Sequence, residues 1–184
     1  MLLIEIVAAL LVAVNVALVA RRSIWNYPFG IAGVVTYAWV FWNARLYSDT
    51  LLQFVFLGAQ LYGWANWARS QSLAGEVVVL RLGAGARLAW AAGIVVATAG
   101  WGALMHRYTD AAAPWLDAGV AMTSIAAQWL MARRLIENWV LWILVNALSV
   151  VLYAWRGLWP TFALYVVLLA LAAWGLAQWR RAAR

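Results

Sequence analysis

The sequence has no cysteine, a single histidine and very little charge. Of its 184 residues, 10% are Asp, Glu, Lys or Arg and 68% are apolar. The absence of cysteine excludes a disulfide framework and a thiol-ligated metal site. The lone histidine, His106, cannot form a catalytic triad or a metal site by itself, and we interpret it as a solvated loop residue. A soluble domain is about half apolar and a quarter charged, so this chain has too few charges to cover its surface in water.

Long apolar runs fill the chain instead. A membrane-spanning helix needs roughly 20 predominantly apolar residues. The apolar runs that approach this length are residues 2–20, 27–42, 50–67, 88–105, 117–131, 139–155 and 161–179. The first has no basic leading region and is followed by further runs, which favours a helix over a cleaved signal. The sequence therefore predicts one all-α integral membrane domain over residues 1–184, with seven transmembrane helices.

The basic residues predict the orientation of these helices. All 13 are arginines, and the net charge is +7. Because they lie between apolar runs, they indicate membrane orientation rather than nucleic-acid binding. On one side of the predicted membrane are Arg21, Arg22, Arg69, Arg81, Arg87, Arg133, Arg134, Arg180, Arg181 and Arg184, and on the other are Arg45, Arg107 and Arg156. Basic loops stay cytoplasmic, so we expect the N-terminus outside and the C-terminus in the cytoplasm.

An internal repeat appears when the chain is aligned with itself at a shift of 112 residues. The matching pairs include Asn26 with Asn138, Tyr27 with Trp139, Ile31 with Ile143, Leu46 with Leu158, Leu52 with Leu164, Gly63 with Gly175 and Trp67 with Trp179. The shift predicts two parallel three-helix repeats, residues 1–68 and 117–180, joined by a linker helix over residues 86–106. Parallel repeats of this kind occur in transporters, where the substrate pathway follows an axis normal to the bilayer.

The densest group of candidate binding residues lies in residues 138–146. Trp139, Trp142 and Asn146 are spaced i, i+3, i+7 and share one helix face. Indole faces attract positive charge, and a carboxamide offers donors and an acceptor, so this face suits a flat, polar, cationic ring. An alternative is structural: Asn146 and the nearby Ser149 could simply hydrogen-bond neighbouring helices.

Other polar residues inside the predicted spans are candidates for the same site, because polar groups in a membrane usually face a cavity or the bundle interior. Gln53 and Gln60 lie two helical turns apart, and Thr161 and Tyr165 are spaced i, i+4. The candidate substrate-binding residues are Trp139, Trp142, Asn146, Gln53, Ser149, Thr161, Tyr165, Gln60 and Asn26. Ser124 and Gln128 share a face of the fifth span without entering this set.

Several functions lack the residues they would need. The phosphate-binding pattern G-x-x-x-x-G-K-[ST] is missing, so the sequence encodes no ATP-driven motor. A membrane-embedded enzyme would need His, Asp or Glu clustered at mid-membrane, and the sequence places none there. We therefore predict a protein that is not an enzyme and uses no metal or cofactor. A purely structural membrane subunit would not require a repeat with matching polar faces.

At these residues the chain resembles the PnuC family of vitamin transporters. In the second repeat the resemblance rests on Glu137-Asn138-Trp139-Val140-Leu141-Trp142 followed by Asn146, Ser149-Val150 and Gly157. In the first repeat it rests on Asn26-Tyr27-Pro28-Phe29-Gly30, Leu51-Leu52-Gln53 and Tyr62-Gly63-Trp64 with Trp67. The run E-N-W-x-x-W-x-x-x-N is the most specific part.

The resemblance implies a seven-helix, SWEET-like fold in a 3+1+3 arrangement in the bacterial inner membrane. It also implies uptake of nicotinamide riboside by facilitated diffusion for NAD biosynthesis, with trapping by a cytoplasmic kinase. Trp139 and Trp142 would then hold the pyridinium ring, and Asn146 the carboxamide or a ribose hydroxyl. Thiamine or another vitamin or nucleoside remains an alternative cargo on the same fold. The sequence leaves the oligomeric state open, since small carriers often associate.

Overall fold

The structure is a computed structural model that describes residues 2–43, 45, 47–109, 113–155, 157 and 159–183. Four residues used in the sequence predictions, Arg156 and Arg184 in the orientation and Leu46 and Leu158 in the repeat, lie outside this described part.

Over the described residues the chain forms seven α-helices, which confirms the all-α fold class. They are α1 (Leu2–Ala20), α2 (Asn26–Asn43), α3 (Tyr47–Ala74), α4 (Ala84–Tyr108), α5 (Pro114–Ala132), α6 (Asn138–Trp155) and α7 (Trp159–Ala182). Four of them, α1, α4, α6 and α7, are long and apolar enough to cross a membrane. Buried amides and hydroxyls such as Gln53, Gln60 and Gln128 lower the hydropathy of α3 and α5. Such residues are tolerated in a bundle because they face protein rather than lipid.

The third helix continues past its predicted end. It was expected to stop at Trp67 but runs on to Ala74, where Gly75 has a φ of +73°. A left-handed glycine directly after a helix ends it without the steric cost that a Cβ would add. Residues 69–87, between two predicted apolar runs, are therefore the last part of α3 and the beginning of α4, joined by a short non-helical linker at residues 75–83.

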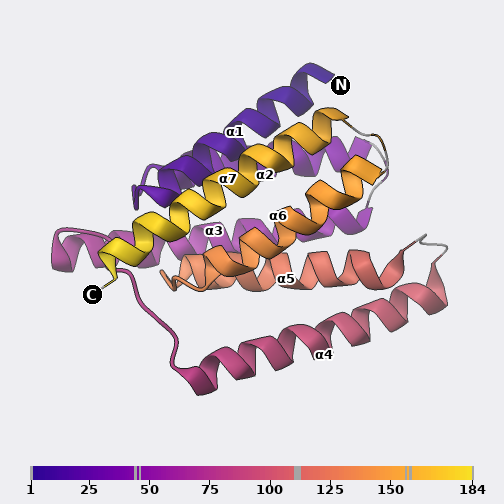
Figure 1. Ribbon diagram of the computed structural model, residues 1–184. Coiled ribbons are helices and arrows are strands. Elements are labelled where there is room, and N and C mark those ends of the chain that lie inside the picture. Colours follow the sequence, from indigo (N-terminus) through magenta and orange to yellow (C-terminus); the bar gives the residue numbers. More distant parts are fainter. Residues whose placement is uncertain are drawn as a thin grey trace.

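Six of the helices form a closed ring (Figure 1). Around the ring, α1 contacts α2, α2 contacts α3, α3 contacts α5, α5 contacts α6, α6 contacts α7, and α7 returns to α1. Within the described residues α4 contacts α5 and no other helix, so it lies outside the ring along its edge. Helices α1–α3 thus form one side of the ring and α5–α7 the other; we call them the first and second units.

The two ends of the bundle differ in charge. The N-terminus and the C-terminus lie at opposite ends (Figure 1). At the C-terminal end, Arg22 pairs with Glu76, Arg81 donates to the Ala183 carbonyl, and Arg87 pairs with Glu137. We call this the arginine-rich end. Its loops are the ones that the sequence predicts to be cytoplasmic.

The turns at this end recur 112 positions apart. Arg22 and Arg134 both have a left-handed backbone, with φ of 59° and 63°. The side-chain amide of Asn26 donates to the Ser23 carbonyl at 2.7 Å, and that of Asn138 donates to the Leu135 carbonyl at 2.6 Å. Each asparagine thus closes the turn that precedes its helix, α2 in one unit and α6 in the other.

Paired indoles join the two units. The Trp67 indole donates to the Met131 carbonyl at 3.2 Å, and the Trp179 indole donates to the Val19 carbonyl at 3.0 Å. Each bond runs from the last helix of one unit to the end of the first helix of the other, and both indoles are fully buried. These reciprocal bonds stabilise the contact between the units at the arginine-rich end.

An aromatic cluster fills the arginine-rich end of the ring. It consists of Tyr27, Trp67, Trp139 and Trp179, all buried. Tyr27 meets Trp67 edge-on at 5.4 Å, and Trp139 meets Trp179 edge-on at 5.7 Å. Edge-to-face geometry places the positive ring edge against the negative ring face, which adds about 0.5–1.5 kcal/mol to the burial of each pair.

Candidate functional site

The predicted face of α6 is buried inside the ring. Asn146 is 5% exposed and Ser149 is 4% exposed, whereas Val151 on another face of the same helix is 68% exposed. The side chain of Trp142 is half-buried and packs against the aromatic cluster. Asn146, which the spacing placed on one face with Trp139 and Trp142, therefore lies on the protein side of α6, as does Ser149.

Trp139 has a different environment from Trp142. It is 1% exposed and belongs to the aromatic cluster, where its ring meets Trp179 edge-on. Three of its ring carbons lie 2.5–2.6 Å from the place where a Cβ on Gly175 would sit. Both faces of this indole therefore lie in protein packing, and Trp142 is the more accessible of the two.

On α7, the candidate Tyr165 lies against the C-terminal half of α6. The Tyr165 ring stacks on Tyr153 at 5.2 Å, and its hydroxyl lies near Ser149 and Tyr153. Thr161, one turn earlier on α7, is half-buried. The structure thus brings Ser149 and Tyr165 together, so the second unit presents an indole, an amide and two hydroxyls.

The first unit contributes amides. Gln53 is 8% exposed and Gln60 is 4% exposed, so the two-turn spacing identified a buried face of α3. Gln60 lies against Gly30 of α2: its Nε2 is 2.5 Å from the position a Gly30 Cβ would occupy. The Gln60 Oε1 is buried and has no protein hydrogen-bond partner. An unpaired buried carbonyl is costly, and it is available to a polar ligand.

Asn15 is a site residue that the sequence reading missed. It is 8% exposed in α1, its amide nitrogen donates to the Asn26 carbonyl at 2.8 Å, and it packs on Gly30 beside Gln60. A carboxamide in the middle of an apolar run was the available signal, because such residues face the interior. Asn26 itself is fully buried and closes the turn before α2, so it reaches this group through Asn15.

The fifth helix adds a third group of polar side chains. Thr123, Ser124 and Gln128 are 6–8% exposed, and the Gln128 Nε2 is buried without a partner. The sequence singled out Ser124 and Gln128 by their spacing but did not assign them to the site. Gln128 offers an unused donor where Gln60 offers an unused acceptor.

The chemistry available to these side chains is uniform. The buried polar residues of the described chain are Asn15, Asn26, Thr50, Gln53, Gln60, Ser70, Thr123, Ser124, Gln128, Asn138, Asn146 and Ser149. All are amides or hydroxyls, so this interior can hydrogen-bond a polar molecule but cannot neutralise a charge with an ion pair. Within the described residues no group of three His, Cys, Asp or Glu could hold a metal ion.

Comparison with known proteins identifies relatives over nearly the whole chain. Residues 2–181 match the family described as "Nicotinamide mononucleotide transporter". The nicotinamide riboside transporter PnuC of Escherichia coli (strain K12) is 29% identical over 206 residues, covering 98% of this chain and 86% of that protein. The riboflavin/roseoflavin transporter RibM of Streptomyces davaonensis is 30% identical, covering 95% of this chain and 83% of that protein.

A solved structure has the same fold. The crystal structure of the vitamin B3 transporter PnuC superposes with a TM-score of 0.79 at 31% sequence identity. The match covers 95% of this chain and 79% of that chain. The arrangement of helices described above is therefore shared with a vitamin B3 transporter.

Proposed function

The chain belongs to the nicotinamide mononucleotide transporter family, and we propose that it carries nicotinamide riboside across the membrane by facilitated diffusion. It is a multi-pass membrane protein of a transporter family, as its relatives and its apolar helices show. The name of the E. coli relative supports the riboside as cargo. The sequence has no ATP-binding loop, which supports passive movement down a gradient.

The observation that carries the choice of cargo is the uncharged interior. Nicotinamide riboside and nicotinamide mononucleotide differ by one phosphate group. The buried polar side chains are amides and hydroxyls. A phosphate enclosed there would lack a cationic partner, and an unpaired buried charge is strongly unfavourable. A pyridinium ring, in contrast, can stack on the half-buried Trp142, whose π face attracts a cation.

We assign the following roles to the predicted residues. Trp142 stacks on the pyridinium ring, with Trp139 supporting it from the aromatic cluster. Asn146 bonds the carboxamide or a ribose hydroxyl. The remaining contacts to carboxamide and ribose come from Gln53, Gln60, Ser149, Thr161 and Tyr165, and Asn26 acts by holding Asn15 in place.

We further propose a 3+1+3 arrangement in which α4 joins two parallel three-helix units. Exchanging α1, α2 and α3 for α5, α6 and α7 leaves the ring of helix contacts unchanged, which supports this division. Further support comes from the turns and indole bonds that recur 112 residues apart. With basic loops in the cytoplasm, all seven helices span the bacterial inner membrane and the N-terminus lies outside.

Net uptake by a passive carrier requires a sink on the cytoplasmic side. We propose that a cytoplasmic kinase phosphorylates the riboside. The product then carries a phosphate that the uncharged interior excludes, so it cannot leave by the same route. This coupling is metabolic and requires no contact between the two proteins.

A second candidate cargo is riboflavin, favoured by the 30% identity to RibM. Its isoalloxazine ring could also stack on Trp142, but it is neutral and larger than a pyridinium. Thiamine, with a cationic thiazolium ring, is a further alternative.

The test is uptake of labelled nicotinamide riboside into proteoliposomes that contain the purified protein and no ATP. We expect saturable uptake that stops at concentration equilibrium and is competed by unlabelled riboside but not by the mononucleotide. Uptake of riboflavin or thiamine without uptake of the riboside would overturn the cargo assignment while preserving the transport mechanism.

A further inference from the structure

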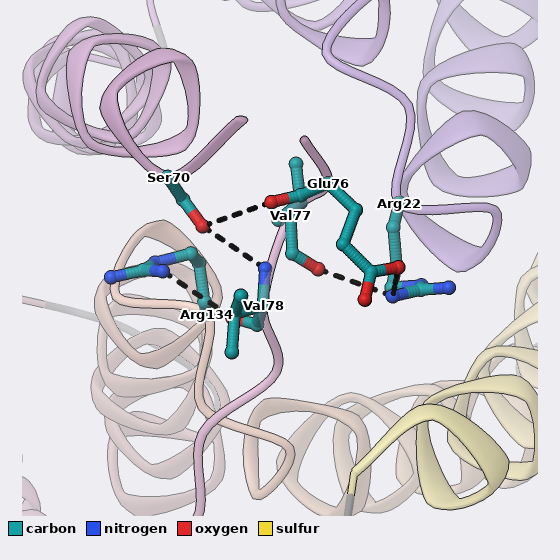
Figure 2. A network of polar contacts seen from close by, with 6 residues as sticks. All are labelled: Arg22, Ser70, Glu76, Val77, Val78 and Arg134. Atoms are coloured by element: carbon teal, nitrogen blue, oxygen red, sulfur yellow. Dashed lines mark hydrogen bonds and ion pairs between the residues drawn. The ribbon is translucent and has the colours of Figure 1, made fainter. Parts of the chain in front are cut away.

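The linker between α3 and α4, residues 75–83, runs across the arginine-rich end of the bundle (Figure 2). Two of its side chains, Val77 and Val79, are 3% and 8% exposed and belong to the same core cluster as Tyr27, Trp67, Trp139 and Trp179. The linker therefore covers the aromatic cluster instead of looping out into solvent. Surface hollows of about 250 and 260 Å³ flank it, one beside Arg22 and the other beside Arg134.

The start of the linker is fastened to the first unit. Figure 2 shows the Ser70 hydroxyl donating to the Glu76 carbonyl at 3.3 Å and accepting from the Val78 amide at 3.0 Å. Arg22, in the turn between α1 and α2, pairs with the Glu76 carboxylate at 3.0 Å and donates to the Val77 carbonyl at 3.3 Å. We call these contacts the first anchor.

The end of the linker is fastened to the second unit. Leu80 forms a parallel β-bridge with Leu135, in the turn between α5 and α6. The Leu80 amide donates to the Arg134 carbonyl at 2.9 Å, and the Ile136 amide donates to the Leu80 carbonyl at 3.0 Å. Beyond the bridge, Glu137 accepts from the Leu82 amide at 3.1 Å and pairs with Arg87 at 2.9 Å. We call these contacts the second anchor.

The segment between the anchors is too short to let the units separate. The first anchor reaches Val78, whose carbonyl also accepts a hydrogen bond from Arg134 of the second unit at 3.4 Å, and the second anchor begins at Leu80. A residue spans at most about 3.3–3.6 Å of extended chain. Any opening of this end by more than a few ångströms must therefore break one anchor.

We propose that the linker is a strap that closes the arginine-rich end, and that the Leu80–Leu135 bridge releases whenever this end opens to pass substrate. The first anchor lies within a single unit and includes an ion pair, so it can move with that unit. The bridge connects the strap to the opposite unit through two backbone hydrogen bonds, and Leu80 is 42% exposed. If the two units separated, this bridge is the contact that would be pulled apart.

The strap explains how a passive carrier avoids being an open channel. Alternating access requires that one end of the pathway be closed while the other is open, with the units rocking against each other. In this structure the closed end is the one crossed by the strap. This inference rests on the proposed transport function, since a protein that moves no substrate needs no such closure.

The chain contains no cysteine, so an introduced pair forms the only disulfide that it can make. Paired residues of a β-bridge have Cα atoms within the 4.4–6.8 Å range that disulfides usually span. In the double variant Leu80→Cys/Leu135→Cys, oxidation fixes the strap to the second unit. We expect riboside uptake into proteoliposomes to fall roughly tenfold or more on oxidation, because opening is blocked, and to recover on adding reductant.

The matched control is Ser70→Cys/Val78→Cys, which cross-links the same strap within the first anchor. The Ser70 hydroxyl contacts the Val78 amide directly, so the two backbones are close. This disulfide joins parts that move together, and we expect oxidised and reduced protein to transport within about twofold of each other.

Binding of nicotinamide riboside, followed by tryptophan fluorescence, separates the possible failures. If the reduced variants neither bind nor transport the riboside, the proposed function is wrong. If they do both, and the oxidised Leu80→Cys/Leu135→Cys protein transports at the reduced rate, the strap is not the closure. Loss of uptake with riboside binding retained in that oxidised protein, together with an unaffected control pair, supports the strap.

Discussion

At the arginine-rich end, residues of α1–α3 and the residues 112 positions later in α5–α7 make the same contacts. Gly63 leaves room for the Tyr27 hydroxyl, whose oxygen is 2.6 Å from where a Cβ would sit, and Gly175 leaves room for Trp139 at 2.5 Å. Further along the helices from this end, the likeness disappears. The first unit has Asn15, Gly30 and Gln60 packed together, and the matching positions in the second are Ala127, Trp142 and Ala172.

These two sets of three residues differ in which position holds the large side chain and in whether the side chains are polar. In the first unit, two amides fill the space above a glycine. In the second unit, the matching positions hold a large indole and two buried alanines. Under the proposed transport function, the matched ends would let both units move in the same way, and the differing residues would hold the two sides of an asymmetric molecule.

The largest effect should come from removing the indole. Trp142→Ala loses the stacking surface for a cationic ring, worth about 2 kcal/mol or more when desolvated, which corresponds to roughly 30-fold weaker riboside binding. Isothermal titration of the purified protein measures this change. The control is Trp155→Ala on the same helix, where the side chain is 83% exposed and binding should stay within about twofold. An equal loss in both variants would contradict the assignment of Trp142.

The shared packing at the ends predicts matched losses of stability. Gly63→Ala and Gly175→Ala each force a methyl group into an aromatic ring, and overpacking of this kind costs about 1–3 kcal/mol. Thermal unfolding in detergent should show a similar decrease for both variants. Gly58→Ala, on the same helix as Gly63 but with nothing near its Cβ position, should be neutral or slightly stabilising. A loss for only one of the two packed glycines would break the comparison between the units.

Substitutions at Gln60 and Asn15 should affect different properties, riboside binding in one case and stability in the other. Gln60→Ala removes a carbonyl with no protein partner, so we expect about tenfold weaker riboside binding, the value of one good hydrogen bond, with little change in unfolding temperature. Asn15→Ala removes the bond to the Asn26 carbonyl, and should lower stability by about 0.6–1.7 kcal/mol. The reverse pattern, with Gln60 needed for stability and not for binding, would place it outside the site.

The smallest effect is expected at the bonds between the units. Trp67→Phe and Trp179→Phe keep an aromatic ring but delete one indole bond each, to Met131 and to Val19. The lost hydrogen bond alone should cost about 0.6 kcal/mol, the average in a membrane bundle, and the smaller Phe ring adds a packing cost at these fully buried positions. Because the two indole rings contact each other, with centroids 5.8 Å apart, the loss in the double variant should differ from the sum of the two single losses. Thermal unfolding of the single and double variants provides the check.

The sequence predicted the fold well because hydrophobicity and length set membrane helices directly. The predicted and observed first helix both end at Ala20, and the buried face of α6 follows from spacing. The extension of α3 to Ala74 was missed since Arg69 and Ser70 are polar, and only Gly75 marks where that helix ends. Polar residues at a membrane surface do not break a helix.

The parts of the site that were missed depend on contacts between helices. Nothing local to Asn15 shows that it meets Gln60 over Gly30, because α1, α2 and α3 must first be packed. The difference between Trp139 and Trp142 is also tertiary: Trp139 is fully buried in the aromatic cluster, whereas Trp142 packs against that cluster and is half-buried. Spacing places side chains on a helix face but cannot say how far along that face the pathway extends.

The most direct test of the account is a side-by-side titration of the purified protein with nicotinamide riboside, nicotinamide mononucleotide, thiamine and riboflavin, followed by tryptophan fluorescence. The account predicts saturable quenching by the riboside, little response to the mononucleotide, and loss of the riboside signal in Trp142→Ala but not in Trp155→Ala. Tighter binding of the mononucleotide than of the riboside would contradict the uncharged site on which the proposed function rests.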